Sequence, residues 1–131
     1  MRIIKFRAKK LSNGDWIYGS LVSSKDIGPA IYFQTGNGMV KTMDWVYVKE
    51  DSICQFTSLY DKNGKEIYEG DILKVQGTDE KIEVRFVRGV FAFLWNGNLD
   101  DESPINAPTH EWAEVIGNIH DNPKLLKRIK R

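Results

Sequence analysis

Hydrophobic and polar residues alternate along much of the chain, which is the period-2 pattern of strands that bury one face. The first such run alternates apolar residues with basic ones, in the order Ile4, Lys5, Phe6, Arg7, Ala8 and Lys9. A second alternating run covers residues 82–87, and a mostly apolar run follows it at 90–95, after Gly89. These runs predict an all-β protein.

Asn-Gly pairs separate the predicted strands at four places: Asn13-Gly14, Asn37-Gly38, Asn63-Gly64 and Asn96-Gly97. A tight hairpin turn needs residues that tolerate φ > 0, and both Asn and Gly do so. The first pair lies between the runs 3–9 and 15–22, and the second links 30–34 to 39–43. Four such pairs indicate repeated tight reversals, which few helical proteins would carry.

The run QFTSLYDKNGKEIYEGDIL, residues 55–73, predicts a hairpin that leads into a small barrel. β-prone residues flank its Asn-Gly turn on both sides. Gly70 is expected to break the strand, and the carboxylate of Asp71 to cap the turn. Apolar alternation after Gly-Asp is common at the corners of SH3-like barrels, so we expect a small SH3-like barrel over residues 53–119.

The remaining segments complete the predicted organisation. Residues 1–52 are expected to form an N-terminal β-hairpin or meander region. The polar stretch 96–111 is interpreted as a long loop, and residues 112–119 as the last strand. Because Asn122-Pro123 can start a helix, residues 120–131 are expected to form a short C-terminal helix or a basic tail.

Length and composition fit a globular protein without a disulfide framework. The 131 residues suit one domain or two small halves, and folding should bury roughly two-thirds of the accessible surface. The single cysteine, Cys54, cannot form an internal disulfide and fits a reducing compartment. Met1 leads directly into a charged strand, and no apolar run is long enough for a membrane span. We therefore expect a cytoplasmic protein with no membrane partner.

Charge is concentrated at the two ends of the chain. Residues 1–10 and 124–131 each hold five basic residues and no acid, whereas 11–123 hold nine basic and eighteen acidic residues. If both ends fold onto one face, they would form a phosphate-binding surface. The alternative, which we favour, is that the first strand has a wet basic side and that the terminal residues are a solvated tail.

Aromatic residues suggest a possible binding face. Four tryptophans and two phenylalanines lie on predicted strands: Trp16, Trp45, Trp95, Trp112, Phe91 and Phe93. Small barrels can stack bases on exposed rings beside Lys or Arg. The simpler interpretation is that these rings fill the core, with Phe86 pointing inward. The candidate nucleic-acid or partner contacts are Lys5, Arg7, Lys9, Lys74, Arg85, Arg88, Lys127 and Arg128; Lys81 could add charge to the outward face.

The sequence contains no recognisable catalytic or metal-binding motif. The histidines His110 and His120 lack zinc-ligand spacing, and the acidic run 100–102 lacks the pattern of a calcium loop. Glu66, Glu69 and Asp71 gather at the predicted barrel entry, where turn capping and exposed strand charge suffice to explain them. Cys54 lies in an apolar context and is expected in the core. We therefore expect no catalytic residue, no metal site and no cofactor.

Four segments of this chain resemble the YopX family of small phage and prophage proteins: IIKFRAKK, WIYGSL, QFTSLYDKNGKEIYEGDIL and EVIGNIHDNPKLL. The resemblance covers nearly the whole chain, and DKNGKEIYEGDI is its most specific part. The usual pattern Tyr-Thr-Gly-Leu is replaced here by Phe56, Thr57, Ser58 and Leu59. The resemblance implies an all-β protein with a C-terminal SH3-type barrel, self-association and no established activity.

These observations leave three functional hypotheses. The first is a non-enzymatic, oligomeric binding or assembly module that acts on nucleic acid or on a host or phage protein. In this case the apolar side of residues 125–129 could pack on a neighbouring subunit. The second is a structural protein that contacts only other proteins. The third, which we favour least, is a metal-assisted hydrolase that uses the acidic cluster.

Overall fold

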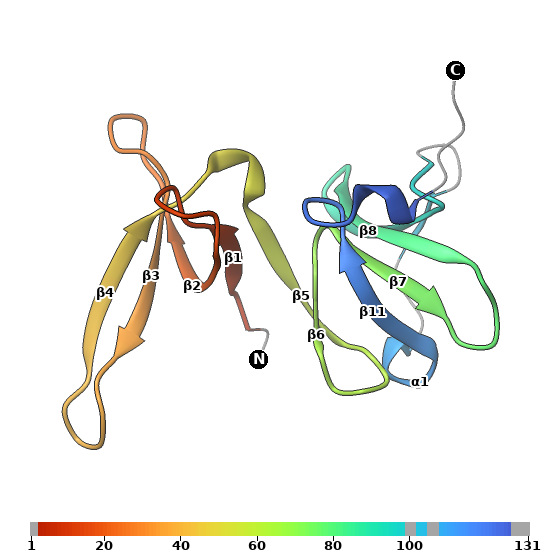
Figure 1. Ribbon diagram of the computed structural model, residues 1–131, viewed down its shortest axis with the longest axis horizontal. Helices are drawn as coiled ribbons and strands as arrows, with labels where there is room; N and C mark the ends of the chain where they lie inside the picture. Colours follow the sequence, from red (N-terminus) through yellow and green to blue (C-terminus); the bar gives the residue numbers. More distant parts are fainter. Residues whose placement is uncertain (1–2, 99–101, 105–107, 127–131) are drawn as a thin grey trace. The chain divides into compact units, whose positions relative to one another are not determined.

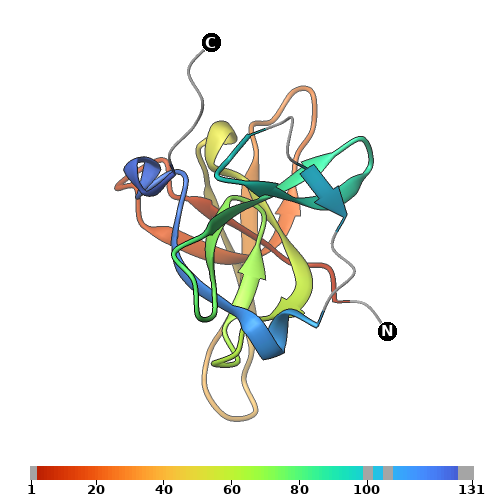
Figure 2. The same ribbon diagram turned by 90° about the vertical axis from the view of Figure 1, so that its right-hand side faces the viewer.

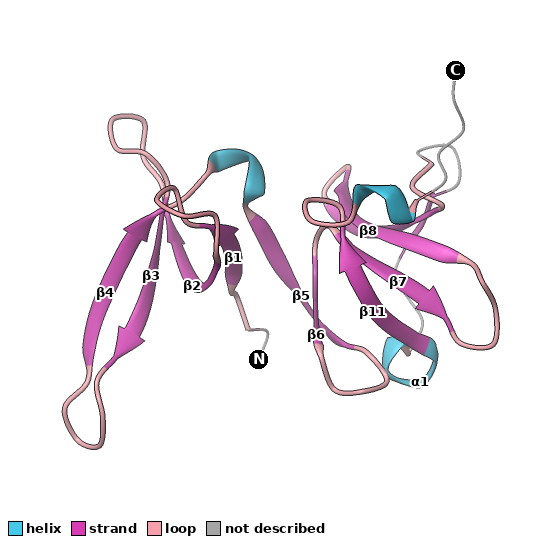
Figure 3. Cartoon of the chain, viewed as in Figure 1, coloured by secondary structure: helices cyan, strands magenta, loops and turns pink. Residues whose placement is uncertain are grey.

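The computed structural model describes residues 3–98, 102–104 and 108–126, and it is an all-β fold. Strands dominate, and the helices in these ranges are single turns (Figure 3). They are the 3-10 turns η1 (Glu50–Ser52) and η3 (Pro123–Leu125) and the α-helical turn α1 (Thr109–Trp112). The all-β prediction is confirmed. None of these helices is long and apolar enough to span a membrane.

The chain divides into two compact units, residues 1–56 and 57–131, four residues after the boundary expected from the sequence. In the first unit the strand order is β4-β3-β2-β1-β5, and neighbouring strands pair antiparallel (Figure 1). Its strands are β1 (Phe6–Lys9), β2 (Trp16–Val22), β3 (Ala30–Thr35), β4 (Thr42–Tyr47) and the first part of β5 (Cys54–Tyr60).

The second unit holds the end of β5, which neighbours β6, and a sheet of order β10-β9-β8-β7-β11. These strands are β6 (Glu66–Tyr68), β7 (Asp71–Val75), β8 (Lys81–Val87), β9 (Val90–Trp95), β10 (Glu102–Pro104) and β11 (Ala113–Asn118). The SH3-like description of this unit stays a prediction.

The long loop expected at 96–111 is wrong, because β10 and α1 lie within it. β10 pairs with β9 at the end of the sheet order, a position where polar residues and proline are tolerated in a strand. The hydroxyl of Thr109, at the start of α1, donates to the Tyr60 carbonyl at 2.9 Å. Polar composition therefore marked a sheet edge here rather than an absence of structure.

The Asn-Gly pairs form turns as predicted. Their glycines have φ values of 79°, 63°, 81° and 75° in the order Gly14, Gly38, Gly64 and Gly97. Gly70 also has a positive φ and interrupts the chain between β6 and β7, where the Asp71 carboxylate accepts the Tyr68 N–H at 2.7 Å. The predicted break and cap are both confirmed.

Each unit has its own hydrophobic core. In the first unit Ala8, Ile31 and Val48 are buried, and the partly buried residues packed around them are Phe6, Ile17, Leu21, Val46 and Ile53. In the second unit Trp95 and Trp112 pack against a cluster of buried residues: Ile67, Leu73, Ile82, Val84, Phe93 and Ala113. The core assignment of these two tryptophans and of Phe93 is confirmed.

The inward orientation expected for Phe86 is wrong, because this residue is 48% exposed. Phe86 lies opposite Phe91 at the turn end of the β8–β9 hairpin, and the two rings meet edge to face with centroids 5.2 Å apart. The alternation from Val84 to Phe86 is regular, but the hairpin extends beyond the core that would cover the ring. The alternation of apolar residues predicts which side of a strand a residue lies on. It does not predict how far along the strand the core extends.

The described part of the C-terminal segment packs on its own unit. Leu126 is buried, and a Cβ on Gly117 of β11 would lie 3.0 Å from a methyl carbon of Leu125. The expectation that Leu125 and Leu126 pack on a neighbouring subunit is therefore wrong. The turn that contains them packs on β11 of the same chain. Ile129, the third residue of that apolar side, lies outside the described residues.

Asp61 organises the turn of the family-like run. One of its carboxylate oxygens accepts the N–H groups of Asn63 and Lys65, both at 2.9 Å, and the other accepts the Val115 N–H at 3.0 Å. The side chain is almost fully buried. Burial alone would raise the pKa of Asp61, but these three donors and the charge of Lys65 lower the pKa below its ordinary value of 3.8.

We predict that Asp61→Asn lowers the free energy of unfolding at neutral pH by about 1.5–3 kcal/mol, because an amide nitrogen replaces one accepting oxygen. The folded pKa lies below the unfolded value of about 3.9, so the carboxylate contribution is complete above that value and fades as pH falls through the folded pKa. Urea denaturation at neutral and acidic pH should show the gap between wild type and variant shrinking in acid. The exposed Asp79→Asn is the control, and a gap that is constant with pH would contradict the assignment.

We also predict that Ser58→Gly stabilises the protein. Ser58 lies within β5 with φ of 70°, a left-handed conformation that costs an L-residue about 1–2 kcal/mol. Gly relieves this strain but loses more chain entropy, so the net gain over Ser58→Ala should be about 0.5–1 kcal/mol. Ser58→Ala is the matched control because it removes the hydroxyl and keeps the strain. Thermal unfolding that ranks the alanine variant above the glycine variant would refute this account.

Candidate functional site

The sheet of the first unit has a solvent face that carries aromatic rings. Along β2 the even-numbered residues Tyr18, Ser20 and Val22 are exposed, whereas Ile17 and Leu21 pack on the core. Ser20 lies opposite Tyr32 of β3, and Tyr32 lies opposite Trp45 of β4. Directly opposite residues share a face, so these rings lie on the side away from the core. We call Tyr18, Tyr32, Trp45 and Tyr47 the aromatic surface.

Three rings of this surface, Tyr32, Trp45 and Tyr47, contact one another across and along the strands. Tyr32 and Trp45 are stacked, with centroids 6.1 Å apart and planes 23° apart. Trp45 and Tyr47 meet edge to face at 4.9 Å. Even so, Trp45 and Tyr47 remain 44% and 45% exposed. Aromatic pairs of this kind hold a fixed geometry, which presents the rings to a partner at little further entropic cost.

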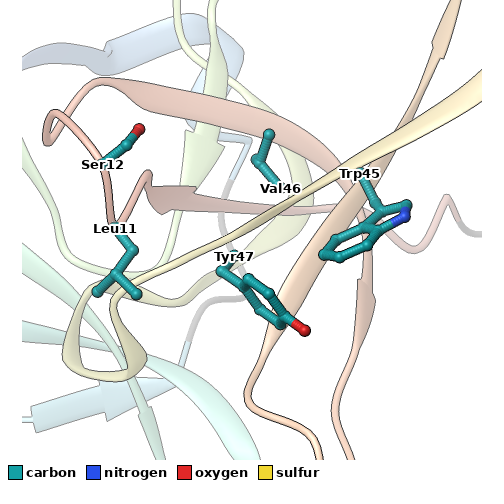
Figure 4. Close-up of a pocket in the computed structure, with 5 residues that line it drawn as sticks. All are labelled: Leu11, Ser12, Trp45, Val46 and Tyr47. Atoms are coloured by element: carbon teal, nitrogen blue, oxygen red, sulfur yellow. The ribbon is translucent and has the colours of Figure 1, made fainter.

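Two hollows flank Trp45 and Tyr47. The first, of about 400 Å³, is lined by Leu11, Ser12 and the β4 segment Trp45–Tyr47 (Figure 4). In that view Trp45 and Tyr47 lie on one side of the β4 ribbon and Val46 on the other. The second, of about 240 Å³, has these further lining residues: Val22, Ser24, Ile27, Gly28, Ala30 and Tyr32. Both hollows lie within the first unit and have mainly apolar side chains as walls.

The open edge of β4 is protected against strand addition. β4 stands at the end of the strand order, which leaves alternate backbone groups without a neighbouring strand. The Tyr47 carbonyl accepts the Leu11 N–H at 3.0 Å, so the same side of β4 carries the Trp45 N–H. That N–H donates to the carboxylate of Asp44 at 2.8 Å. A partner would therefore meet this surface through side chains.

The basic residues of β1, and Lys5 just before it, contact aromatic rings. The Arg7 guanidinium lies 4.7 Å from the centre of the Trp16 ring, and Lys9 Nζ lies 5.4 Å from the same ring. Lys5 Nζ lies 5.3 Å from the centre of the Phe56 ring. Arg7 is only 5% exposed, so the expectation of a wet strand side is wrong at this position. Lys5 and Lys9 are half-buried.

The candidate basic contacts of the second unit are scattered. Lys74 is half-buried on β7. The Arg85 guanidinium pairs with the fully buried Glu83 carboxylate at 2.6 Å, and Arg88 forms an ion pair with Glu102. These ion pairs neutralise the positive charges of Arg85 and Arg88, which a bound phosphate group would need as its counter-charges. Lys127 and Arg128 lie outside the described residues.

The acidic and histidine candidates do not converge on a reaction centre. Glu66 accepts the Tyr68 hydroxyl at 3.0 Å, and Asp71 caps the turn. His110 lies 3.9 Å from Glu111, and both side chains are exposed. Within residues 3–98, 102–104 and 108–126, no three His, Cys, Asp or Glu side chains form a group that could hold a metal ion. Residues 100 and 101 of the acidic run lie outside those ranges.

The predicted position of Cys54 in the core is confirmed. Cys54 is buried, as expected, and its thiol donates to the Ser52 carbonyl at 3.3 Å.

The aromatic surface was not predicted from the sequence, although the sequence contains a pattern that indicates it. Met43, Trp45 and Tyr47 occupy alternate positions of one run, and only the assignment of these positions to the solvent face was missing.

The comparisons with known proteins agree with this fold. The family model described as YopX protein matches residues 5–127. The chain belongs to the YopX family. A solved structure, protein EF1440 from Enterococcus faecalis, is similar to this family member, with 25% sequence identity and a TM-score of 0.65. The match covers 97% of this chain and 100% of that one. No curated protein matches this chain.

We predict that Asp44→Ala increases strand-mediated association. The substitution exposes the Trp45 N–H at an open sheet edge, where a second strand can accept it. Light scattering and a thioflavin signal should rise with time in the variant at concentrations at which the wild type stays clear. Asp26→Ala removes an exposed carboxylate from the same unit and serves as the control. Equal behaviour of the two variants would show that Asp44 does not protect the edge.

Proposed function

We propose that this YopX-family protein is a non-enzymatic binding or assembly module that self-associates through the aromatic surface. The observation that carries the proposal is the exposure of Trp45 and Tyr47 between two apolar hollows. Tyr, Trp and Met are enriched at protein interfaces, and Met43 stands exposed on the same side of β4. The surface needs a partner to cover it, and a second copy is always available.

The size of the exposed area supports a protein partner. Five exposed apolar side chains line the hollows, and three more lie further along the β3–β4 hairpin. The five are Leu11, Val22, Ile27, Trp45 and Tyr47, and the three are Met39, Val40 and Met43. About half of each side chain is exposed or more, so together they offer on the order of 800 Å², the contribution of one partner to a standard interface. Scattered single residues would need no such explanation.

The wider setting is part of the same proposal. We propose an origin in a phage or prophage and action in the cytoplasm of the bacterial host, where a host or phage protein could also use the surface. Membership of the family supports the phage or prophage origin, and a single, buried cysteine, Cys54, agrees with a reducing compartment. We propose no catalytic role.

Nucleic acid is the second candidate partner. Lys9, at the end of β1, and Lys5, just before its start, lie beside aromatic rings, and rings next to cations can stack bases. Binding of a fluorescent single-stranded oligonucleotide should then weaken steeply as salt rises. Absence of binding at low salt would remove this candidate.

We predict that the wild type associates reversibly in the micromolar range and that Trp45→Ala weakens this association about tenfold or more, since central aromatic residues dominate interfaces. Sedimentation velocity over a dilution series measures the change, and circular dichroism checks the fold. Phe86→Ala is the matched control, because Phe86 is an equally exposed ring with an edge-to-face partner in the second unit. A wild type that stays monomeric throughout would refute self-association.

A further inference from the structure

The β3–β4 hairpin, residues 30–47, forms an arm whose tip is apolar. Figures 1 and 2 show the loop between β3 and β4 extending away from the other strands of its unit. In the tip, residues 36–41, Met39 is fully exposed and Val40 is 71% exposed. Met39 and Val40 are adjacent, so the tip offers one small apolar surface whose burial against a partner would be favourable.

The tip is held in place by contacts at its base. The hydroxyls of Thr35 and Thr42 are hydrogen-bonded to each other at 2.7 Å. At Gly36, with φ of 100°, a Cβ would overlap the Val40 carbonyl oxygen, so only glycine allows the two chains to approach this closely. The Val40 N–H donates to the Asn37 carbonyl at 3.3 Å. These contacts present Met39 and Val40 as a preorganised apolar end.

The arm is complementary to itself in two respects. Its tip carries unpartnered apolar side chains, and its base carries the hollow walled by Leu11, Trp45 and Tyr47. Met43, exposed on the same side as Trp45, is midway in sequence between Met39 and Tyr47. Two arms laid antiparallel would therefore place each tip over the base of the other and bring the two Met43 side chains together.

We propose that two copies of this chain pair arm over arm about a two-fold axis at Met43, with Met39 of each copy seated against Leu11, Trp45 and Tyr47 of the other. Because the Trp45 N–H is bound by Asp44, the arms pack face to face and do not extend the sheet. A flexible thioether fits an irregular hollow and contacts aromatic rings favourably. An isologous contact also closes at two copies, as most oligomeric interfaces do. This inference rests on the proposed self-association and adds its geometry.

Cysteine pairing under mild oxidation tests the geometry, because a disulfide requires Cα atoms within about 7 Å. Met43→Cys should form a dimer with itself. A mixture of Met39→Cys and Leu11→Cys proteins should form the mixed dimer, which mass spectrometry of the linked peptides identifies. Val90→Cys is the control, an exposed position in the second unit. Wild-type protein shows that the buried Cys54 does not contribute.

Sedimentation of the reduced proteins separates the two proposals. If they associate but Met43→Cys fails to link, or if Met39→Cys links mainly to itself, the arm geometry is overturned and self-association stands. If they remain monomeric across the micromolar range, both proposals fall. Met39→Ser, which should weaken dimerisation about tenfold without changing the fold, is the supporting measurement. Unchanged dimerisation of Met39→Ser would also count against the seated tip.

Discussion

The second unit depends on the carboxylate of Asp61. It receives two N–H groups from its own turn and a third from Val115, fifty-four residues further along the chain. Next to it, the Lys62 N–H donates to the Ala113 carbonyl at 2.9 Å. The β5–β6 turn and β11 are therefore joined at one buried charge. A buried carboxylate is tolerated only when donors surround it, and here these three donors are backbone N–H groups.

The same solution recurs in the last family-like segment, EVIGNIHDNPKLL. At the end of β11, Asn118 Oδ1 accepts the N–H groups of His120 and Asp121, and Asn122 Oδ1 accepts the Asn118 N–H. The polar residues of both segments are thus used to fix turns. From the sequence alone, motifs this specific suggest a catalytic or binding role. In the structure, their polar side chains are instead hydrogen-bonded within turns. The exposed groups with room for a partner lie instead in the first unit, where the family-like segments are less distinctive.

The parts of the fold that short-range rules govern could be predicted from the sequence. The Asn-Gly turns, the cap by Asp71 and the strands on either side of Gly89 depend on neighbouring residues only. Other features could not be predicted in this way. The contact between Asp61 and Val115 is long-range, and β10 exists only because β9 offers it an edge. The aromatic surface required knowledge of which side of β4 the core occupies.

A single strand, β4, meets three demands at once. Val46 packs toward the core, Asp44 binds the Trp45 N–H at the open edge, and Trp45 and Tyr47 stand exposed. Covering one half-exposed ring contributes about 2–3 kcal/mol, whereas micromolar association needs about 8 kcal/mol in addition to the entropic costs of binding. One ring is therefore insufficient, and the base of the arm cannot hold a partner unless other apolar residues are buried with it. The fully exposed Met39, at the other end of the same hairpin, is the most exposed source of that additional area among the large apolar residues of the described chain.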